Sequence, residues 1–342
     1  MKLIKNLLPA AGIMLLAANA SAEHFKVQVP MSDEEPGAKV FMMDFDTGAK
    51  IDSTTVKDQS AVFEGEIDEP VLARIVTDNN RYGMFILEGG SISFSATTGE
   101  AFGSMQNDRL REFQAKEMEL QNKFRAAQTD NEKEEIYNSY LAEAGRMLKE
   151  NPDNALGYYF FVMELPSLDY KDMKARVDQY PAFAKKERVQ KYLQQAQARE
   201  NTQPGDKFVD FEITYDGKTS RLSDHVGRGH YTLVDFWASW CGPCIRQTHV
   251  LKDIYNEYKD KGLEVLGVAV WDEPENTKTA ITRHELPWEC ILNAQTIPTD
   301  LYGISGIPCI ILFGPDGTIL SRDKQDDELR ADVRRFLEGE NK

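Results

Sequence analysis

The chain has 342 residues, of which 41% are hydrophobic and 10% are aromatic, and its formal net charge is −16. This length allows two or three domains, each with a core of its own, and the composition excludes collagen-like and disordered chains. Because the net charge is strongly negative and no basic patch interrupts it, we expect neither nucleic acid nor anionic lipid among the partners.

The first 22 residues have the pattern of a secretory signal peptide. Lys2 and Lys5 precede an apolar stretch over residues 7–18, and Ala-Ser-Ala at 20–22 provides a small-x-small cleavage site. The apolar stretch is shorter than the roughly 20 residues that a membrane-spanning helix needs. No later segment is apolar enough to span a bilayer. The sequence therefore predicts a periplasmic protein that loses residues 1–22 and does not span the membrane afterwards.

Residues 23–102 alternate short strand patterns with turns. Apolar and polar residues alternate in AVFEGEI and SISFSA, and turn segments such as DTGAK and EGG separate the strands. The pattern predicts a small antiparallel all-β domain with a sandwich-like arrangement. It contains no cysteine, and its only histidine, His24, stands at its beginning, where we expect no catalytic role.

Residues 103–200 are predicted to be a helical segment. Apolar residues such as Leu110 and Phe113 recur at steps of three and four, with Glu, Lys and Gln between them. The segment NPDNALGYYFFVMEL begins with a proline and capping residues and then becomes strongly apolar. Its YYFF run is more typical of a buried helix in a bundle than of a ligand pocket.

Residues 201–342 alternate strands with helices. The run YTLVDFWA at 231–238 is continuously apolar, as expected for a strand in a sheet that is covered on both faces. A helix is predicted over 241–261, ended by Gly262, and LEVLGVAV is the next strand. A second helix, two strands joined by the turn GPDG, and a closing helix follow. This order predicts an α/β domain.

Cys241 and Cys244 stand where the buried strand passes into the helix. A helix N-terminus carries partial positive charge and unpaired N–H groups, which favour a thiolate. We therefore predict a lowered pKa for Cys241, which makes it the nucleophile. Cys244, three residues later, lies on the same face of the helix and is able to close a disulfide or resolve a mixed one. Pro243 is compatible with the first helical turn.

Two other uses of a CxxC pair fit this chain less well. A zinc site would need about two further ligands, and Cys290, Cys309 and His249 have no paired spacing. A structural disulfide over so short a loop would constrain the unfolded chain only slightly. We therefore expect redox cycling, with no metal and no cofactor.

Two residues outside the pair favour the redox interpretation. Asp235 lies in the apolar strand, six residues before Cys241, where burial should raise its pKa and suit it to accept and return a proton. Ile307-Pro308 enters a predicted strand, although proline does not fit freely in a central ladder. A special backbone geometry such as a cis bond is expected there.

The segments LVDFWASWCGPC and YGISGIPCIILF resemble the active-site and cis-proline segments of thioredoxins. Residues 205–337 as a whole resemble the exported, TlpA-like branch of that family. Residues 23–102 are similar to an N-terminal domain of unknown function that accompanies such domains. The resemblance implies an α/β thioredoxin fold at 201–342, after the small all-β domain and the helical segment, and it implies thiol–disulfide oxidoreductase activity.

The resemblance also implies a role for each site residue. Cys241 would be the attacking thiolate, Cys244 the resolving thiol, and Asp235 the proton acceptor for Cys244 through water. Five further residues would contact the substrate beside the redox disulfide: Trp240, Gly242, Pro243, Ile307 and Pro308.

Two positions depart from the family pattern. Gln247 stands three residues after Cys244, where some exported relatives carry glutamate, so proton transfer would rest on Asp235 alone. Cys309 follows Pro308, where thioredoxin has threonine. Its thiol would be a small buried side chain, a disulfide partner for Cys290, or a third redox sulfur.

The CGPC sequence resembles strongly reducing members of the family, whose potentials lie near about −270 mV, against about −120 mV for an oxidising member. We therefore predict a reductase of disulfide-bearing envelope proteins that is kept reduced by a membrane electron donor. Two alternatives stay open. One is a thiol peroxidase on the same fold, and the other is an envelope binding or scaffold protein with residual redox activity.

Overall fold

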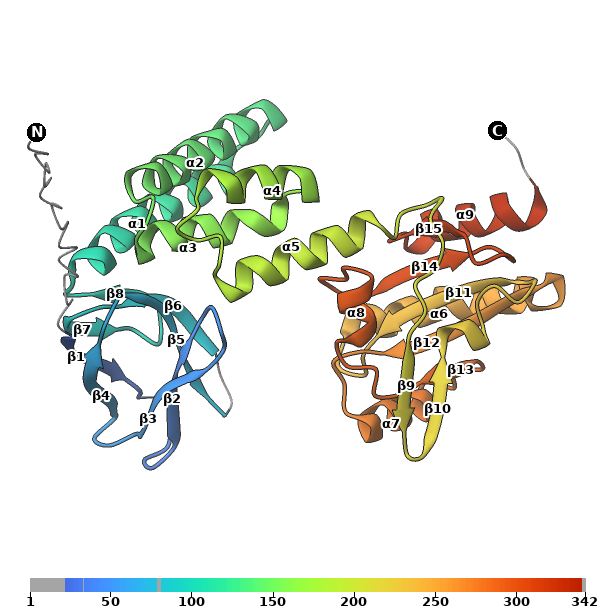
Figure 1. The fold of residues 1–342 in the computed structure, drawn as a ribbon, viewed down its shortest axis with the longest axis horizontal. Helices are drawn as coiled ribbons and strands as arrows, with labels where there is room; N and C mark the ends of the chain where they lie inside the picture. Colours follow the sequence, from blue (N-terminus) through green and yellow to red (C-terminus); the bar gives the residue numbers. More distant parts are fainter. Residues whose placement is uncertain (1–21, 33, 79–80, 340–342) are drawn as a thin grey trace, which may run out of the picture. The chain divides into compact units, whose positions relative to one another are not determined.

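The computed structural model describes residues 22–32, 34–78 and 81–339. The predicted signal peptide at 1–22 therefore lies outside the described residues, except for its last position. The chain divides into two compact units, Met1–Phe161 and Val162–Lys342, which are drawn in Figure 1 and described one at a time below. Within the described ranges, no helix is both long and apolar enough to cross a membrane.

The first unit contains two four-stranded sheets that enclose one hydrophobic core. One sheet has the order β4-β1-β7-β8, with strands β1 (Glu23–Pro30), β4 (Ser60–Ile67), β7 (Gly90–Phe94) and β8 (Ala101–Phe102). The other has the order β3-β2-β5-β6, with strands β2 (Lys39–Asp44), β3 (Lys50–Thr55), β5 (Val71–Thr77) and β6 (Arg81–Leu87). Alternate residues of both sheets, such as Val27 and Ile75, fill the core. The expectation of an all-β, sandwich-like domain is confirmed.

One strand pair corrects the prediction of a purely antiparallel domain. Strand β1 pairs antiparallel with β4 but parallel with β7. A parallel pair requires a long connection between its strands. Residues 31–89 supply that connection, because they form β4 and the whole of the second sheet before the chain returns to β7.

Three helices follow the sandwich: α1 (Met105–Ala126), α2 (Asp130–Glu150) and α3 (Ala155–Glu164), the last of which ends three residues beyond the boundary at Phe161. The buried side chain of Asn107 fixes α1 to β6, because it accepts from Ile86 N at 2.9 Å and donates to Ile86 O at 2.7 Å. The YYFF run lies in α3, where the Phe160 ring meets the Phe113 ring of α1 edge-on at 4.7 Å. Tyr158, Phe160 and Phe161 of this run are buried, as predicted, whereas Tyr159 is partly exposed.

The second unit opens with short helices: η1 (Leu165–Ser167), α4 (Tyr170–Gln179) and α5 (Glu187–Glu200). The Asp169 carboxylate accepts from Asp172 N at 2.8 Å and so begins α4. Leu165, Met173 and Val189 are buried, which gives these helices a packed interior of their own.

The rest of this unit is built on a five-stranded sheet of order β13-β12-β11-β14-β15. Its strands are β11 (Tyr231–Trp237), β12 (Leu263–Ala269), β13 (Glu289–Ile291), β14 (Cys309–Phe313) and β15 (Ile319–Arg322). Strands β11, β12 and β13 run parallel, whereas β14 and β15 are added as antiparallel neighbours. A hairpin of β9 (Glu212–Tyr215) and β10 (Lys218–Arg221) precedes the sheet.

Both faces of this sheet are buried, as the apolar run in β11 predicted. Leu233 packs on one face together with residues of α6 (Gly242–Tyr258) and α9 (Asp326–Glu338). Val234 and Phe236 pack on the other face against the segment around β9 and the chain near Tyr302. Helices α7 (Pro274–Arg283) and α8 (Ile297–Leu301) and the short η2 (Leu222–Asp224) and η3 (Lys259–Lys261) complete the unit.

Candidate active site

The two cysteines lie at the N-terminus of α6, directly after β11. Cys241 is the N-cap residue and Cys244 stands in the first turn. They are joined by a disulfide with 2.06 Å between the sulfur atoms. The Cys241 sulfur also accepts from Cys244 N at 3.1 Å. One of the unpaired N–H groups of the helix start is therefore directed at this sulfur, an arrangement that favours negative charge on it.

The loop before β14 brings the proline next to this pair. The peptide bond Ile307–Pro308 is cis, which is the special geometry that the sequence predicted. Cys309 pairs with Phe236 across β14 and β11, so the loop sits at the end of β11 from which the chain enters α6. The Cys241 sulfur lies 3.8 Å from the carbonyl oxygen of Ile307. The structure thus brings Ile307 and Pro308 to the cysteine pair.

The surface around the pair is open. Trp240 is 62% exposed, and its Nε1 donates to Trp271 O at 2.9 Å. Gly242 and Pro243 are exposed as well, whereas Cys241 itself is buried beneath them at 4% exposure. These residues and the half-buried Ile307 surround Cys241 with surface on which a polypeptide is able to lie.

Asp235 is buried in the sheet behind the pair, at 2% exposure. Among the described residues, its Oδ1 has no hydrogen-bond partner. Burial raises the pKa of the carboxyl group to about 7, because the ionised form loses hydration that nothing replaces. A carboxyl group with this pKa is able both to take up and to release a proton near neutral pH.

A glycine leaves space beside Asp235. In the sheet register, Asp235 pairs with Gly267, and Gly267 pairs with Cys290. A Cβ at Gly267 would lie 3.1 Å from both the Cys290 sulfur and Trp237 Nε1. Because Gly267 has no side chain, Trp237 and Cys290 are able to pack against it, next to its strand partner Asp235.

Cys290 and Cys309 are both free thiols. They lie on β13 and β14, three strand spacings or about 14 Å apart, whereas a disulfide needs Cα atoms within about 7 Å. The alternative of a disulfide between them is therefore wrong. Burial raises the pKa of Cys290 to about 12 and that of Cys309 well above its usual value. The Cys309 thiol donates to Asp323 Oδ1 at 3.1 Å.

Gln247 takes part in a contact between α6 and α9. The amide nitrogen of its buried side chain donates to Asp326 Oδ1 at 3.1 Å, and the amide oxygen accepts from Asp326 N at 3.2 Å. Asp326 is the first residue of α9. Among the described residues of α6 no acidic side chain is buried, and the buried acid in the strand that leads to the pair is Asp235.

Sequence reasoning missed Asp272, a buried residue that holds the loop before Cys241. Its carboxylate accepts from Ser239 N at 2.8 Å, Ser239 Oγ at 2.9 Å and Thr277 Oγ1 at 2.7 Å. The sequence did contain a signal for the position of Asp272. This residue follows β12, the parallel neighbour of β11, and the carboxyl ends of parallel strands meet at one edge of a sheet.

Among the residues described, no group of three or more His, Cys, Asp or Glu side chains is arranged to hold a metal ion. The arrangement is a disulfide-bonded cysteine pair at a helix N-terminus, with a cis-proline loop beside it and a buried carboxyl group in the strand that leads to it.

Family models match two parts of the chain. Residues 204–322 match the AhpC/TSA family, and residues 25–110 match a domain of unknown function, DUF4369. The C-terminal part is a thioredoxin-family domain. The thioredoxin fold predicted for the C-terminal region and the accompanying N-terminal domain are both confirmed.

Curated relatives match about a third of the chain. The thiol-disulfide oxidoreductase ResA of Geobacillus thermodenitrificans is 28% identical over 116 residues, which are 34% of this chain and 66% of that protein. ResA of Oceanobacillus iheyensis is 31% identical over 120 residues, which are 34% of this chain and 62% of that protein. The chain thus spans less than two thirds of the length of these relatives.

Among solved structures, the thioredoxin domain of a thiol-disulfide oxidoreductase from Bacteroides vulgatus is 31% identical. The match covers 39% of this chain and 97% of that domain, with a TM-score of 0.35.

Proposed function

We propose that this protein is a periplasmic thiol–disulfide oxidoreductase that reduces disulfides of envelope proteins through Cys241 and Cys244. The observation that carries the proposal is the placement of this pair at the start of α6, beside the cis bond before Pro308 and in front of buried Asp235. The names of the curated relatives support the reaction class. The signal-peptide pattern of residues 1–22 supports export.

The reaction begins with the reduced pair. The Cys241 thiolate, favoured by the helix N-terminus, attacks one sulfur of the substrate disulfide. A bond forms between Cys241 and that sulfur, the substrate disulfide breaks, and the other substrate sulfur leaves as a thiolate. Trp240, Gly242, Pro243, Ile307 and Pro308 provide the surface that holds the substrate chain at this stage.

The second step releases the substrate. Asp235, as a carboxylate, takes the proton of the Cys244 thiol through water. The Cys244 thiolate attacks the Cys241 sulfur and forms the disulfide seen in the structure, and the second substrate sulfur leaves as a thiolate. Two electrons have passed from the cysteine pair to the substrate. A membrane electron donor returns them to the protein, so that it acts as a reductase.

Replacing Cys241 or Cys244 by serine tests this function. Each replacement should lower insulin-disulfide reduction to the rate of the buffer control, because either sulfur is indispensable to the cycle. Cys309→Ser is the matched control, since serine is also able to donate to Asp323 and Cys309 is outside the pair. If both Cys241→Ser and Cys244→Ser retained activity, the proposed mechanism would be wrong.

The thiol peroxidase alternative predicts a different preferred substrate, which is hydrogen peroxide instead of a protein disulfide. Peroxide reduction prefers a lone peroxidatic cysteine, whereas Cys241 here forms a disulfide with Cys244. A stopped-flow assay with hydrogen peroxide separates the two functions, because the proposed reductase should react with peroxide far more slowly than with a protein disulfide.

A further inference from the structure

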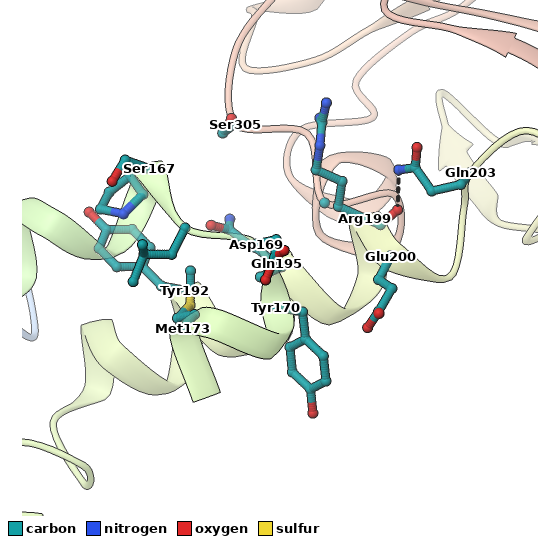
Figure 2. Close-up of a pocket in the computed structure, with 14 residues that line it drawn as sticks. Ser167, Asp169, Tyr170, Met173, Tyr192, Gln195, Arg199, Glu200, Gln203 and Ser305 are labelled. Atoms are coloured by element: carbon teal, nitrogen blue, oxygen red, sulfur yellow. Dashed lines mark hydrogen bonds between the residues drawn. The ribbon is translucent and has the colours of Figure 1, made fainter. Parts of the chain in front are cut away.

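A pocket adjoins the loop that carries the cis-proline. It has a volume of about 680 Å³ and lies within the second unit, between the η1–α4 region, α5, and the loop of Gly303 and Ser305 (Figure 2). In the close-up, Ser305 stands on its loop on one side, and Met173 and Tyr192 come from α4 and α5 on the other. This volume is in the range of pockets that enclose ligands or several side chains.

Helix α5 is held firmly against that loop. A Cβ at Gly303 would lie 2.1 Å from Gln195 O and 2.5 Å from Arg199 N, so the two backbones touch. Arg199 also pairs with Asp323 at 2.6 Å. The buried Arg322 donates to Thr202 O at 3.0 Å and to Tyr302 O at 2.6 Å. The α5 wall of the pocket therefore has a fixed position relative to the cis-proline loop.

The pocket and the cysteine pair border the same loop. Ser305 lines it, and Ile307, whose carbonyl oxygen is 3.8 Å from the Cys241 sulfur, is only two residues further along. Two residues extend over about 7 Å at most. Ser305 and Gly306 are exposed, and their backbone groups make no hydrogen bond within the part of the chain that the structure describes. An extended peptide pairs readily with such free groups.

The lining favours particular side chains. Leu168 and Tyr192, which are both partly exposed, offer apolar surface. Asp169 and Glu200 bring negative charge and form no ion pair with any described residue, whereas the charge of Arg199 is taken up by Asp323. The pocket therefore suits a chain segment that carries an apolar side chain and a lysine or arginine.

We infer that this pocket binds the extended polypeptide segment that flanks the reactive cysteine of the substrate, with preference for apolar and basic residues. The inference rests on the proposed function, to which it adds a determinant of substrate choice that lies partly outside the thioredoxin-family domain. A small disulfide needs only to reach Cys241 and would not occupy the pocket.

A blocking substitution tests the inference. In the full-length protein, Ala196→Trp places a large side chain into the pocket from α5. Gln197→Trp is the matched control, because Gln197 is exposed on the same helix and does not line the pocket. Initial rates are compared for a disulfide-linked peptide with leucine and arginine beside the cysteine and for oxidised glutathione. We expect Ala196→Trp to lower kcat/KM about tenfold for the peptide, mainly through KM, with glutathione reduction unchanged.

The outcomes separate this inference from the proposed function. Reduction of either substrate by the wild type supports the proposed function, and failure with both would contradict it. An unchanged kcat/KM for the peptide, an equal loss with both substrates, or a loss with glutathione alone would overturn the inference.

A second pair of variants and a binding measurement test the inference without introducing a tryptophan. Glu200→Gln removes one negative charge from the pocket, and Glu285→Gln removes one from an exposed position elsewhere. Calorimetric titration uses the same peptide with serine in place of cysteine, so that no redox step occurs. Glu200→Gln should weaken binding about threefold or more, whereas Glu285→Gln should not; equal affinities for both variants would overturn the inference.

Discussion

At the residue scale, the site depends on the contrast between two buried acids. Asp272 is surrounded by hydroxyl and N–H donors, and it organises the loop before Cys241. Asp235 has an oxygen without a partner among the described residues, and burial raises its pKa to about 7. The first acid is therefore structural, and the second is suited to proton transfer.

Asp235→Asn should slow the step in which Cys244 releases the mixed disulfide by about a hundredfold or more, because a general base typically contributes that much. The attack by Cys241 should change little. In the wild type, the resolution rate should rise with pH around 7, as Asp235 becomes ionised, and the variant should lack this rise. Rapid-quench analysis of the mixed disulfide between pH 5 and 9 measures both steps.

The same substitution has a predicted effect on stability. The pKa of Asp235 is about 7 in the fold against an ordinary 3.8, so between these values the folded protein holds a proton that the unfolded chain releases. The wild type therefore loses stability as the pH rises from about 4 to about 7. Relative to wild type, the free energy of unfolding of the variant should rise over this window, by at most about 4 kcal/mol. A stability difference that stayed constant in urea titrations across this range would contradict the assignment.

At the scale of elements, β11, α6 and the cis-proline loop could be predicted because their signals are local. The apolar run at 231–238 indicates a strand buried on both faces, and Gly262, at φ 91°, ends the α6–η3 helical stretch where the sequence indicated. Asp272 and the parallel β1–β7 pair could not be predicted in this way, because each depends on contacts between distant segments. The docking of α5 depends on such contacts as well.

Gly303→Ala should loosen α5 from the thioredoxin-family domain. Gly303 has φ 58°, and the added Cβ would overlap the α5 backbone at Gln195 and Arg199. We expect a loss of roughly 2–4 kcal/mol in the free energy of unfolding, measured by urea titration. Gly306→Ala is the matched control, since a Cβ there meets open space and should cost little stability. Equal stabilities for the two variants would show that the contact does not hold the helix.

At the scale of the whole molecule, sulfur chemistry is confined to the second unit. All four cysteines lie from Cys241 onward, and the first unit, a β sandwich with three helices, carries none. The pattern of alternating strands could show that the first unit is all-β, but it could not show that the predicted helical segment divides between the two units. That division depends on which core each helix joins.

The central claim is that Cys241 attacks a protein disulfide and Cys244 resolves the product. The most direct measurement incubates reduced Cys244→Ser protein with a disulfide-bearing substrate protein and identifies the covalent product by mass spectrometry under non-reducing conditions. The account predicts a stable mixed disulfide through Cys241, which is absent in a Cys241→Ser, Cys244→Ser double variant. A linkage through Cys290 or Cys309, or no covalent complex at all, would contradict it.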